Sequence, residues 1–480
     1  MRNVIWLVLA MAGVQCAAAQ EITAAPALMQ LHVQAQAGFK ELVCEPRTPS
    51  RRPPTAQNPD PMEMPDPDML PVRVKRPAQT DTAEGLPARR GTLPPSFRPN
   101  FPGQPYRMAI WGDSHLAAGF FSEELVKQLN VPGDAVSNVL LPANMGRAGV
   151  RLPIRRSCVS PQWKYEPGYL GRDNATAPGP GLMNMFSDQP DSTLAWDVRK
   201  DAKAAGYERV RILYQQTGAP VHLAISVDGG AEQPVILDGQ EGPAVLELLA
   251  GQPISQVRLR LVAGALRFQG LELSSPQAHP FEIDVFGYPG ATVAGWKSAD
   301  IDYLRRWFIQ RPYQLVMLEF GTNEGNAAPF NLAAYRNTLT ESVRNMRTVF
   351  PTATCILIAP GDRGVLVPRS VNTRRRKAGR LPDIDLMRFA TIHAEIGRTQ
   401  REVAEEAGCI AWSMQDAMGG RGQSYYWAQQ TPAWMAKDLI HFTPAGYRQL
   451  AREFFMDMGW VPLPTPTARE TLLRVDAPIL

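Results

Sequence analysis

Short apolar runs alternate with longer amphipathic segments along residues 281–458, and this alternation limits the folds open to the chain. The apolar runs read FEIDVFG, QLVMLEF, TCILIAP and CIAWSM, and the segments that follow carry apolar residues at helical spacing. Strands buried on both faces are continuously apolar, and parallel neighbours need a helical crossover between them. The pattern therefore predicts a parallel sheet with helices on both faces.

A further strand of this sheet is expected far upstream, in the stretch RMAIWGDSHLAAGF at residues 107–120. Its apolar run ends at Gly-Asp-Ser, and the residues from His115 onward have a helical pattern. A serine on such a strand-to-helix turn, here Ser114, presents its hydroxyl outside the sheet. Because Gly-Asp-Ser also occurs in ordinary turns, its interpretation depends on the ends of the other strands.

The pattern changes between residues 151 and 280. Short runs of strand type, such as RVRILYQQ, VHLAISV and QVRLRLV, are separated by Gly-Gly, Asp-Gly and Gly-Gln turns. This spacing is typical of a small β-sandwich. We therefore expect a discontinuous α/β domain over residues 106–150 and 281–465, interrupted by an inserted β-sandwich over residues 151–280.

The first 105 residues are expected to lie outside both domains. Residues 1–19 carry one early arginine, an apolar segment and a run of alanines, which is the layout of a cleaved secretory signal. A membrane anchor is the alternative, but the apolar segment is shorter than the roughly 20 residues that span a bilayer. Within the N-terminal segment 20–45, residues 27–42 are predicted to form a short helix. Residues 46–105 read as a proline-rich linker.

Charge and cysteine content exclude some classes of function. The 50 basic and 46 acidic residues are evenly spread, so we expect no nucleic-acid partner. No Cys/His spacing indicates a metal site. Four cysteines remain after the signal, and Cys355 and Cys409 are predicted to be buried thiols. A disulfide between Cys44 and Cys158 is a hypothesis, because both flank irregular segments in a chain expected to be exported.

Four loops at the carboxyl ends of the predicted strands carry residues that suit acyl transfer. In a parallel sheet, chemistry collects at these ends. Ser114 needs a base, which His441 can supply, and Asp438 can orient the imidazole from three residues earlier. The amides of Ser114 and Gly290 and the side chain of Asn323 are candidates to bind an oxyanion. Alternatively, His441 caps or packs against the final helix.

In this order the four blocks resemble those of the SGNH, or GDSL-type, hydrolases, which supply serine, glycine, asparagine and an Asp-x-x-His pair. The resemblance implies a flavodoxin-like, five-stranded parallel sheet and no metal or organic cofactor. It also implies that Ser114, Asp438 and His441 are catalytic. Ser114, Gly290 and Asn323 would form the oxyanion hole.

The inserted strands between the first two blocks, with FGTNE, GCIAWSMQDAMGG and KDLIHFTPAGY, resemble bacterial peptidoglycan O-acetylesterases over residues 106–458. That resemblance implies a periplasmic enzyme that removes acetyl from the C6 hydroxyl of N-acetylmuramic acid. No integral membrane span is expected after signal removal. Two features depart from the family: Pro289, and a long basic loop at 363–380, which would meet anionic glycan or lie as a solvated surface loop.

The same resemblance implies an insert similar to a carbohydrate-binding module. Trp196, Tyr207 and Tyr214 are candidates either for its core or for sugar-stacking surfaces. Other functions stay open: an O-acetyltransferase, an esterase for another acetylated polysaccharide, or a glycan-binding protein with an inert hydrolase core.

Overall fold

The computed structural model describes most of the predicted α/β domain and of the insert. Its described residues are 25–34, 40–44, 62–64, 105–131, 136–137, 140–143, 149–172, 177–275, 281–327, 329–368 and 385–462. The predicted signal at residues 1–19, most of the predicted linker and most of the basic loop lie outside these residues. None of the helices in the described part of the chain is long and apolar enough to cross a membrane.

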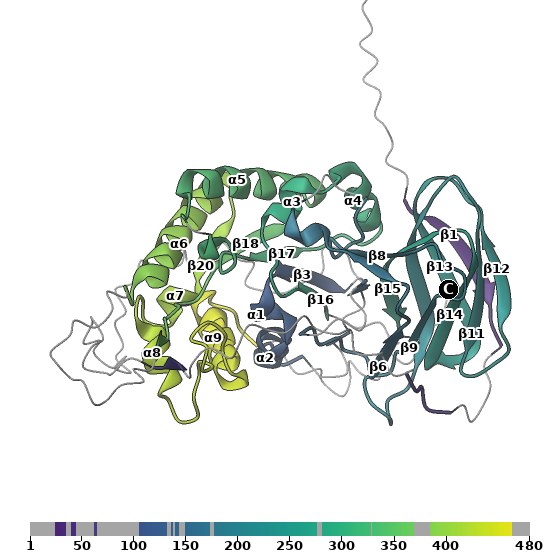
Figure 1. Cartoon of the computed structure of the whole chain (residues 1–480), viewed down its shortest axis with the longest axis horizontal. Helices are drawn as coiled ribbons and strands as arrows, with labels where there is room; N and C mark the ends of the chain where they lie inside the picture. The colour runs from purple at the N-terminus through teal and green to yellow at the C-terminus, as the bar shows by residue number, and fades with distance from the viewer. Residues whose placement is uncertain are drawn as a thin grey trace, which may run out of the picture.

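The predicted parallel sheet is present, and it runs through the middle of the molecule (Figure 1). Its strands follow the spatial order β20-β18-β17-β3-β16-β4, and every pair is parallel. They are β3 (Tyr106–Gly112), β4 (Val136–Ser137), β16 (Phe281–Gly287), β17 (Leu315–Glu319), β18 (Thr354–Ala359) and β20 (Ile410–Ser413). The short edge strand β4 is a sixth strand that the sequence pattern did not predict.

Helices cover both faces of this sheet, as predicted. Along β3, Met108 and Ile110 belong to one hydrophobic cluster, whereas Ala109 and Trp111 belong to another on the opposite face. Figure 1 shows α3, α4 and α5 above the sheet, α6 at its left, and α1, α2 and α9 below it. The helices are α1 (Ser114–Ala117), α2 (Phe120–Gln128), α3 (Ala294–Ser298), α4 (Ile301–Phe308), α5 (Leu332–Val349), α6 (Arg388–Ala407), α7 (Met414–Ala417), α8 (Gln423–Ala428) and α9 (Pro444–Asp457).

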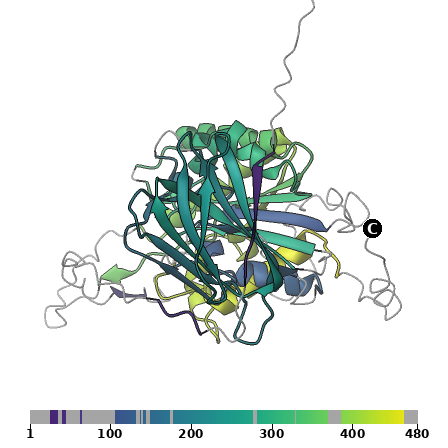
Figure 2. The same cartoon turned by 90° about the vertical axis from the view of Figure 1, so that its right-hand side faces the viewer.

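Two further sheets stand beside the parallel one, and Figure 2 shows them facing the viewer. One has the order β1-β13-β10-β15-β8-β7, with β5 also paired to β15, and the other has the order β12-β11-β14-β9-β6. Their strands are β1 (Ala27–His32), β5 (Leu140–Pro142), β6 (Arg156–Val159), β7 (Lys164–Glu166), β8 (Asn184–Ser187), β9 (Thr193–Asp197), β10 (Tyr207–Gln216), β11 (Val221–Val227), β12 (Gln233–Leu237), β13 (Gly242–Ile254), β14 (Gln256–Ala263) and β15 (Leu266–Ser274).

The two sheets share one hydrophobic cluster. Trp196 on β9 stacks on Phe268 of β15, with the ring centroids 5.4 Å apart. Trp196 and Tyr214 are both buried in this cluster, so they are core residues and not sugar-stacking surfaces. Tyr207 is only partly buried and packs against the rim of the cluster.

The prediction of a helix at residues 27–42 is wrong. Residues 27–32 form β1, which adds a parallel strand to the edge of the seven-stranded sheet beside β13. The side chains that pack on the hydrophobic cluster are those of Met29, Leu31 and Val33. These buried residues recur at every second position, which is the period of a strand. The local pattern of residues 27–42 contains no information about β13, the pairing partner of β1, which lies more than two hundred residues later in the sequence.

The cysteines form two disulfides. Cys44 pairs with Cys158, as hypothesised, and links the segment after β1 to β6. Cys355 pairs with Cys409, so the prediction of two free thiols is wrong. Cys355 lies on β18 and Cys409 directly precedes β20, and these neighbouring parallel strands bring the two Cα atoms to 4.8 Å, within disulfide range.

A buried polar network joins the parallel sheet to the seven-stranded sheet. Asp284 on β16 is fully buried, and one of its oxygens accepts from the amide of Leu140 on β5. Its other oxygen accepts from the guanidinium of Arg311, at 3.2 and 2.9 Å, and from the hydroxyl of Tyr313. Arg311 also reaches Glu272 on β15 at 3.5 Å. Arg311 therefore supplies the buried positive charge of this joint.

We expect Arg311→Met to lower the free energy of unfolding by about 3–5 kcal/mol, because the Asp284 carboxylate would stay buried without its counter-charge. Urea unfolding followed by tryptophan fluorescence measures this change. Arg260→Met is the matched control, because the Arg260 ion pairs with Asp191 and Glu232 are exposed and should contribute less than about 1 kcal/mol. Equal losses in the two variants would contradict the role given to Arg311.

Candidate active site

Ser114 is the first residue of α1, directly after the central strand β3. The preceding Asp113 caps the helix, because its side chain accepts from the amide of His115 at 2.9 Å. Gly112 allows the sharp exit from the strand, since an added Cβ would lie 2.6 Å from Glu319 Oε2 and 2.7 Å from the Leu116 side chain. The close approach of β17 thus requires glycine at this position.

The structure brings Ser114, His441 and Asp438 into one hydrogen-bonded chain. Ser114 Oγ lies 3.0 Å from His441 Nε2, and His441 Nδ1 lies 2.8 Å from Asp438 Oδ2. The second carboxylate oxygen, Asp438 Oδ1, accepts from the amides of Ile440 and His441, each at 3.0 Å. The carboxylate therefore fixes both the turn and the imidazole, which is the arrangement of a serine activated by an oriented base.

Electrostatics favour a basic imidazole at this position. The hydrogen bond that His441 Nδ1 donates to Asp438 raises the pKa of His441 above its ordinary value, although partial burial opposes the shift. Partial burial disfavours the ionised form of Asp438, but hydrogen bonds from the His441 ring and from two amides outweigh it. They hold the pKa of Asp438 well below its usual range. The pair is therefore arranged to receive a proton on His441 while Asp438 stays ionised.

Gly290 and Asn323 lie in the loops that follow β16 and β17. Gly290 is exposed and has φ +83°, and an added Cβ there would meet no atom within 4 Å. Glycine is therefore favoured by the left-handed backbone and not by crowding. The Asn323 side-chain amide donates to the carbonyl of Ala291 at 2.8 Å and more weakly to Asp113 Oδ2 at 3.4 Å. It thus ties together the loops after β3, β16 and β17.

The buried Glu319 and the partly buried Glu324 support these loops, and the sequence analysis assigned a role to neither. Glu324 Oε1 accepts from the amide of Val293 at 2.8 Å and its Oε2 from the amide of Gly321 at 3.1 Å. Glu319 Oε2 accepts from the amide of Asp113 at 3.1 Å. Glu319 ends an otherwise apolar strand, LVMLE, and an acidic residue inside a buried run is the signal that could have identified it.

Burial controls the charge of these acids. Desolvation raises the pKa of Asp113 to about 6 and that of Glu324 to about 7. Desolvation, reinforced by the charge of Asp113, raises the pKa of Glu319 far more. Burial therefore favours the neutral form of Glu319, which avoids two adjacent buried charges beneath Ser114.

His115 packs behind the proposed base. Its ring lies 5.6 Å from that of His441, and its Nδ1 lies 3.2 Å from the hydroxyl of Tyr447 on α9. Burial lowers the pKa of His115 to about 3, so the ring is neutral in the folded protein. His115 consequently adds no positive charge beside His441.

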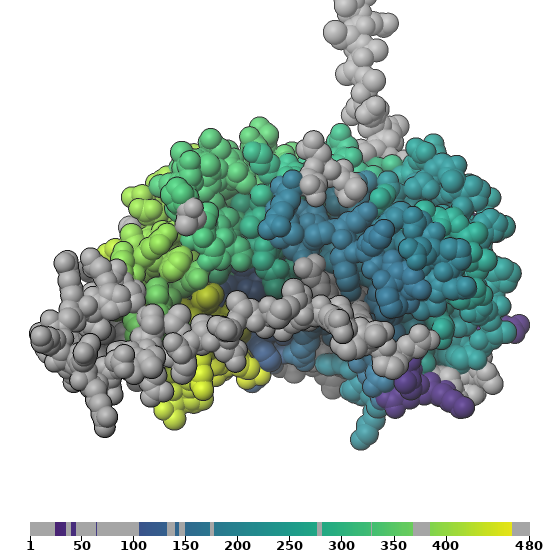
Figure 3. Space-filling view, viewed as in Figure 1, coloured from purple at the N-terminus to yellow at the C-terminus, as the bar shows by residue number. Residues whose placement is uncertain are grey.

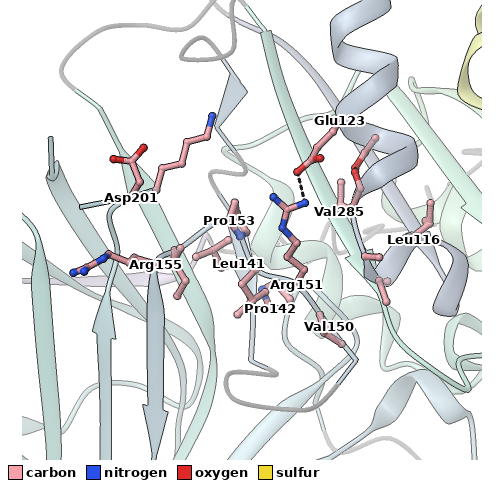
Figure 4. A pocket seen from close by; sticks show the side chains of 18 of the residues that line it. Leu116, Glu123, Leu141, Pro142, Val150, Arg151, Pro153, Arg155, Asp201 and Val285 are labelled. Carbon is pink, nitrogen blue, oxygen red and sulfur yellow. Dashed lines mark hydrogen bonds and ion pairs between the residues drawn. The ribbon is translucent and has the colours of Figure 1, made fainter. Parts of the chain in front are cut away.

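A separate cavity of about 380 Å³ lies between α1, α2 and the segment that leads into β6 (Figure 4). Arg151 reaches across it to Glu123, with 2.7 Å between the charged atoms. Neither Ser114 nor His441 lines this cavity. We therefore place the candidate site at the strand ends, where Figure 3 shows blue atoms near α1 meeting yellow C-terminal atoms.

The described residues hold no cluster of three or more His, Cys, Asp or Glu side chains suited to a metal ion. The strand-end site is instead built from one serine, one histidine and one carboxylate, with amide donors around them. This donor set fits proton transfer and acyl transfer at a hydroxyl.

Residues 272–449 match the model of the GDSL-like lipase/acylhydrolase family, so the chain contains a hydrolase domain of that type. The matched part includes Gly290, Asn323, Asp438 and His441 but not Ser114. The pairing of β3 between β16 and β17 brings Ser114 to the matched residues despite the intervening strands.

Among the solved structures similar to this chain, a peptidoglycan O-acetylesterase supports the fold. It aligns with a TM-score of 0.55 at 21% identity, over 75% of this chain and 91% of that one. An acetylxylan esterase from Geobacillus stearothermophilus aligns over 39% of this chain and 77% of its own, with 20% identity and a TM-score of 0.28. A family two carbohydrate esterase from Cellvibrio japonicus aligns over 64% of this chain and 98% of its own, with 13% identity and a TM-score of 0.24. No curated protein sequence matches the chain.

We expect His441 to titrate above pH 6.5, the ordinary histidine pKa, and to shift downward in Asp438→Asn, which removes the negative charge. NMR of protein carrying ¹³C-labelled histidine measures these shifts. His115 and His393 are internal controls: burial lowers their pKa values to about 3 and about 4, so both should stay neutral at pH 5.5. A His441 pKa that does not move in Asp438→Asn would contradict the pairing.

Proposed function

Given its GDSL-type hydrolase domain, we propose that this protein is a serine esterase that removes O-acetyl groups from a carbohydrate. The observation that carries the proposal is the chain of contacts from Ser114 Oγ through His441 to Asp438, at 3.0 and 2.8 Å. A hydroxyl in ordinary surroundings is a weak nucleophile, and contact with an oriented imidazole is what activates it.

In the proposed reaction, Ser114 Oγ attacks the acetyl carbonyl while its proton passes to His441 Nε2. The tetrahedral intermediate collapses when the ester bond to the sugar breaks, and His441 returns the proton to the departing sugar oxygen. Water then attacks the acetyl-Ser114 ester, and its proton follows the same route through His441. Acetate leaves and the serine hydroxyl is regenerated. Asp438 stabilises the imidazolium in both steps.

The oxyanion of each tetrahedral intermediate would be bound by the amides of Ser114 and Gly290 and by the Asn323 side chain. Among the described residues, neither backbone amide donates to a protein acceptor, so both are available to a ligand oxygen. The long contact from Asn323 to Asp113, 3.4 Å, is the one that an oxyanion would replace. The shorter contact with Ala291 can keep the side chain in place.

We propose O-acetylated peptidoglycan as the substrate, with the acetyl group on C6 of N-acetylmuramic acid. The fold likeness to a peptidoglycan O-acetylesterase, which extends over 91% of that chain, supports this choice. Export to the periplasm fits both the N-terminal signal pattern and the two disulfides, because disulfides persist in oxidising compartments. The residue ranges 106–150 and 281–465 would form the hydrolase domain and 151–280 the carbohydrate-binding insert, whose seven-stranded sheet also takes in β1 and β5. Glycan contacts by this insert would need side chains other than the buried Trp196 and Tyr214.

The first test measures acetate released from O-acetylated peptidoglycan and from acetylated xylan by the mature protein and by Ser114→Ala. We expect release that prefers peptidoglycan and falls by at least about 10⁴ in Ser114→Ala, since the nucleophile is lost. A preference for xylan would keep the mechanism and exclude the substrate. Acetyl transfer to an added glycan without free acetate would identify a transferase, and glycan binding without turnover would identify an inert core.

The second test concerns the oxyanion donors. Asn323→Ala should lower kcat for 4-nitrophenyl acetate by about 10²–10³ with little change in KM, because the donor acts on charge formed in the transition state. Asn345→Ala is the matched control: this amide also donates to two carbonyls, those of Trp296 and Lys297, but lies away from the site. Parallel loss of kcat and of the melting temperature in Asn323→Ala would indicate a structural role instead.

A further inference from the structure

Arg363 lies in the loop that follows β18, beside the turn that carries Asp438 and His441. The amide of Gly364 donates to the carbonyl of Leu439, at 3.0 Å, so the two loops are joined directly. Gly361 packs closely on the residue after His441, since an added Cβ would lie 2.6 Å from the ring of Phe442. The Arg363 side chain therefore starts next to the proposed catalytic pair.

Two contacts fix the guanidinium of Arg363. Its Nη1 donates to the side-chain oxygen of Asn326, three residues after Asn323. The guanidinium carbon also lies 4.0 Å from the centre of the Phe389 ring, near the start of α6. The cation thus spans the loop of the proposed oxyanion donor and the turn of the proposed base.

No acceptor among the described residues meets the opposite edge of this guanidinium, formed by Nε and Nη2. Arg363 Nε is buried and has no hydrogen-bond partner, and Nη2 donates to none of the described residues. Asp438 is the nearby acid, but both its oxygens already accept hydrogen bonds within its own turn. Buried donors in proteins are nearly always paired, and no described residue supplies an acceptor to this edge, so it can bind an acceptor of a ligand.

Other arginines of this chain show what that edge binds. Arg199 presents Nε and Nη2 to Asp197 at 2.8 and 2.6 Å, and Arg260 presents the same pair to Glu232 at 3.1 and 2.6 Å. Both are two-point contacts with a single carboxylate, the geometry for which the planar guanidinium is suited. This comparison indicates that a carboxylate fits the corresponding edge of Arg363.

The loop does not need Arg363 to hold its shape. The neighbouring Asp362 accepts from Gln415 Nε2 and from the amide of Ser424, each at 2.8 Å. On the other side, the amide of Val365 donates to the hydroxyl of Tyr425 at 2.8 Å. Because both flanks are anchored independently, removal of the guanidinium should leave the loop in place.

We propose that Arg363 forms an anion subsite that binds a carboxylate of the acetylated glycan next to the reacting ester. This inference rests on the proposed esterase function and narrows its substrate to acidic glycans. In muramic acid the lactyl ether ends in such a carboxylate. Where peptidoglycan carries stem peptides on this lactyl group, the peptides supply further carboxylates. Neutral acetylated sugars, such as those of xylan, lack this group and would gain nothing from Arg363.

The test compares kcat/KM for 6-O-acetyl-N-acetylmuramic acid, for its lactyl methylamide and for its lactyl dipeptide amide with a free terminal carboxylate. We expect the wild type to prefer an acid over the neutral methylamide by at least about tenfold, the size of a charge-assisted contact. Arg363→Gln should bring this ratio close to one. The preferred acid tells whether the lactyl group or the peptide is bound.

Arg336→Gln is the matched control, since it removes one arginine on α5 that pairs with Glu402 and Glu406, away from the site. Arg363→Lys keeps the charge but loses the two-point contact, so its ratio should be intermediate. A wild-type ratio near one, or an unchanged ratio in Arg363→Gln, would overturn the subsite. Because each ratio compares two substrates of the same enzyme, a general change in His441 basicity cancels.

Binding tests the subsite without turnover. NMR titration of Ser114→Ala with N-acetylmuramic acid and with its methylamide should show preference for the acid, lost in Ser114→Ala/Arg363→Gln. If no acetyl ester is hydrolysed but this preference is found, the esterase proposal fails and the subsite stands. If Ser114-dependent hydrolysis occurs and binding shows no preference, only the subsite fails.

Discussion

The parallel pairing of β3 between β16 and β17 is the constraint on which the candidate site depends. Gly112, the last residue of β3, lies level with Gly287 on β16 and with Glu319 on β17. The three strands consequently end together, and the loops that carry Ser114, Gly290 and Asn323 leave the sheet at one edge. The long stretch between β3 and β16 does not disturb this register, because it forms separate sheets beside the parallel one.

Buried and partly buried acids hold these loops, so carboxyl groups lie close to the nucleophile. Glu324 joins the loops after β16 and β17 through two amides, and Asp113 fixes the start of α1. Burial raises the pKa of each of these acids, and Glu319 is raised furthest. A neutral Glu319 can accept from the Asp113 amide without adding a second buried charge. The positioning of Ser114 and the protonation of Glu319 are thus two aspects of one arrangement.

The sequence was most informative where a pattern is local. The alternation after residue 281 predicted the parallel sheet and its two helical faces, and the polar strand ends pointed to five candidate residues whose loops leave this sheet at one edge. It failed where the decisive neighbour is distant: β1 is a strand because β13 offers it an edge, and Cys355 meets Cys409 because β18 lies beside β20. Glu324 is part of the motif FGTNE, but its two amide partners belong to loops that only the fold brings together.

Arginine shows why charge counts reveal so little about function. The chain has 50 basic and 46 acidic residues, and these totals do not distinguish one arginine from another. What an arginine does depends on how deeply it is buried and on which groups it contacts. Arg311 is buried against Asp284 and joins two sheets, whereas Arg260 pairs with acids at the surface. Arg363 is held by an amide and an aromatic ring, with its carboxylate-binding edge open. Because neither of these groups is charged, the positive charge of Arg363 is not neutralised and can attract an anionic ligand. Arg363 lies beside His441, so the ligand that we propose for it is the substrate.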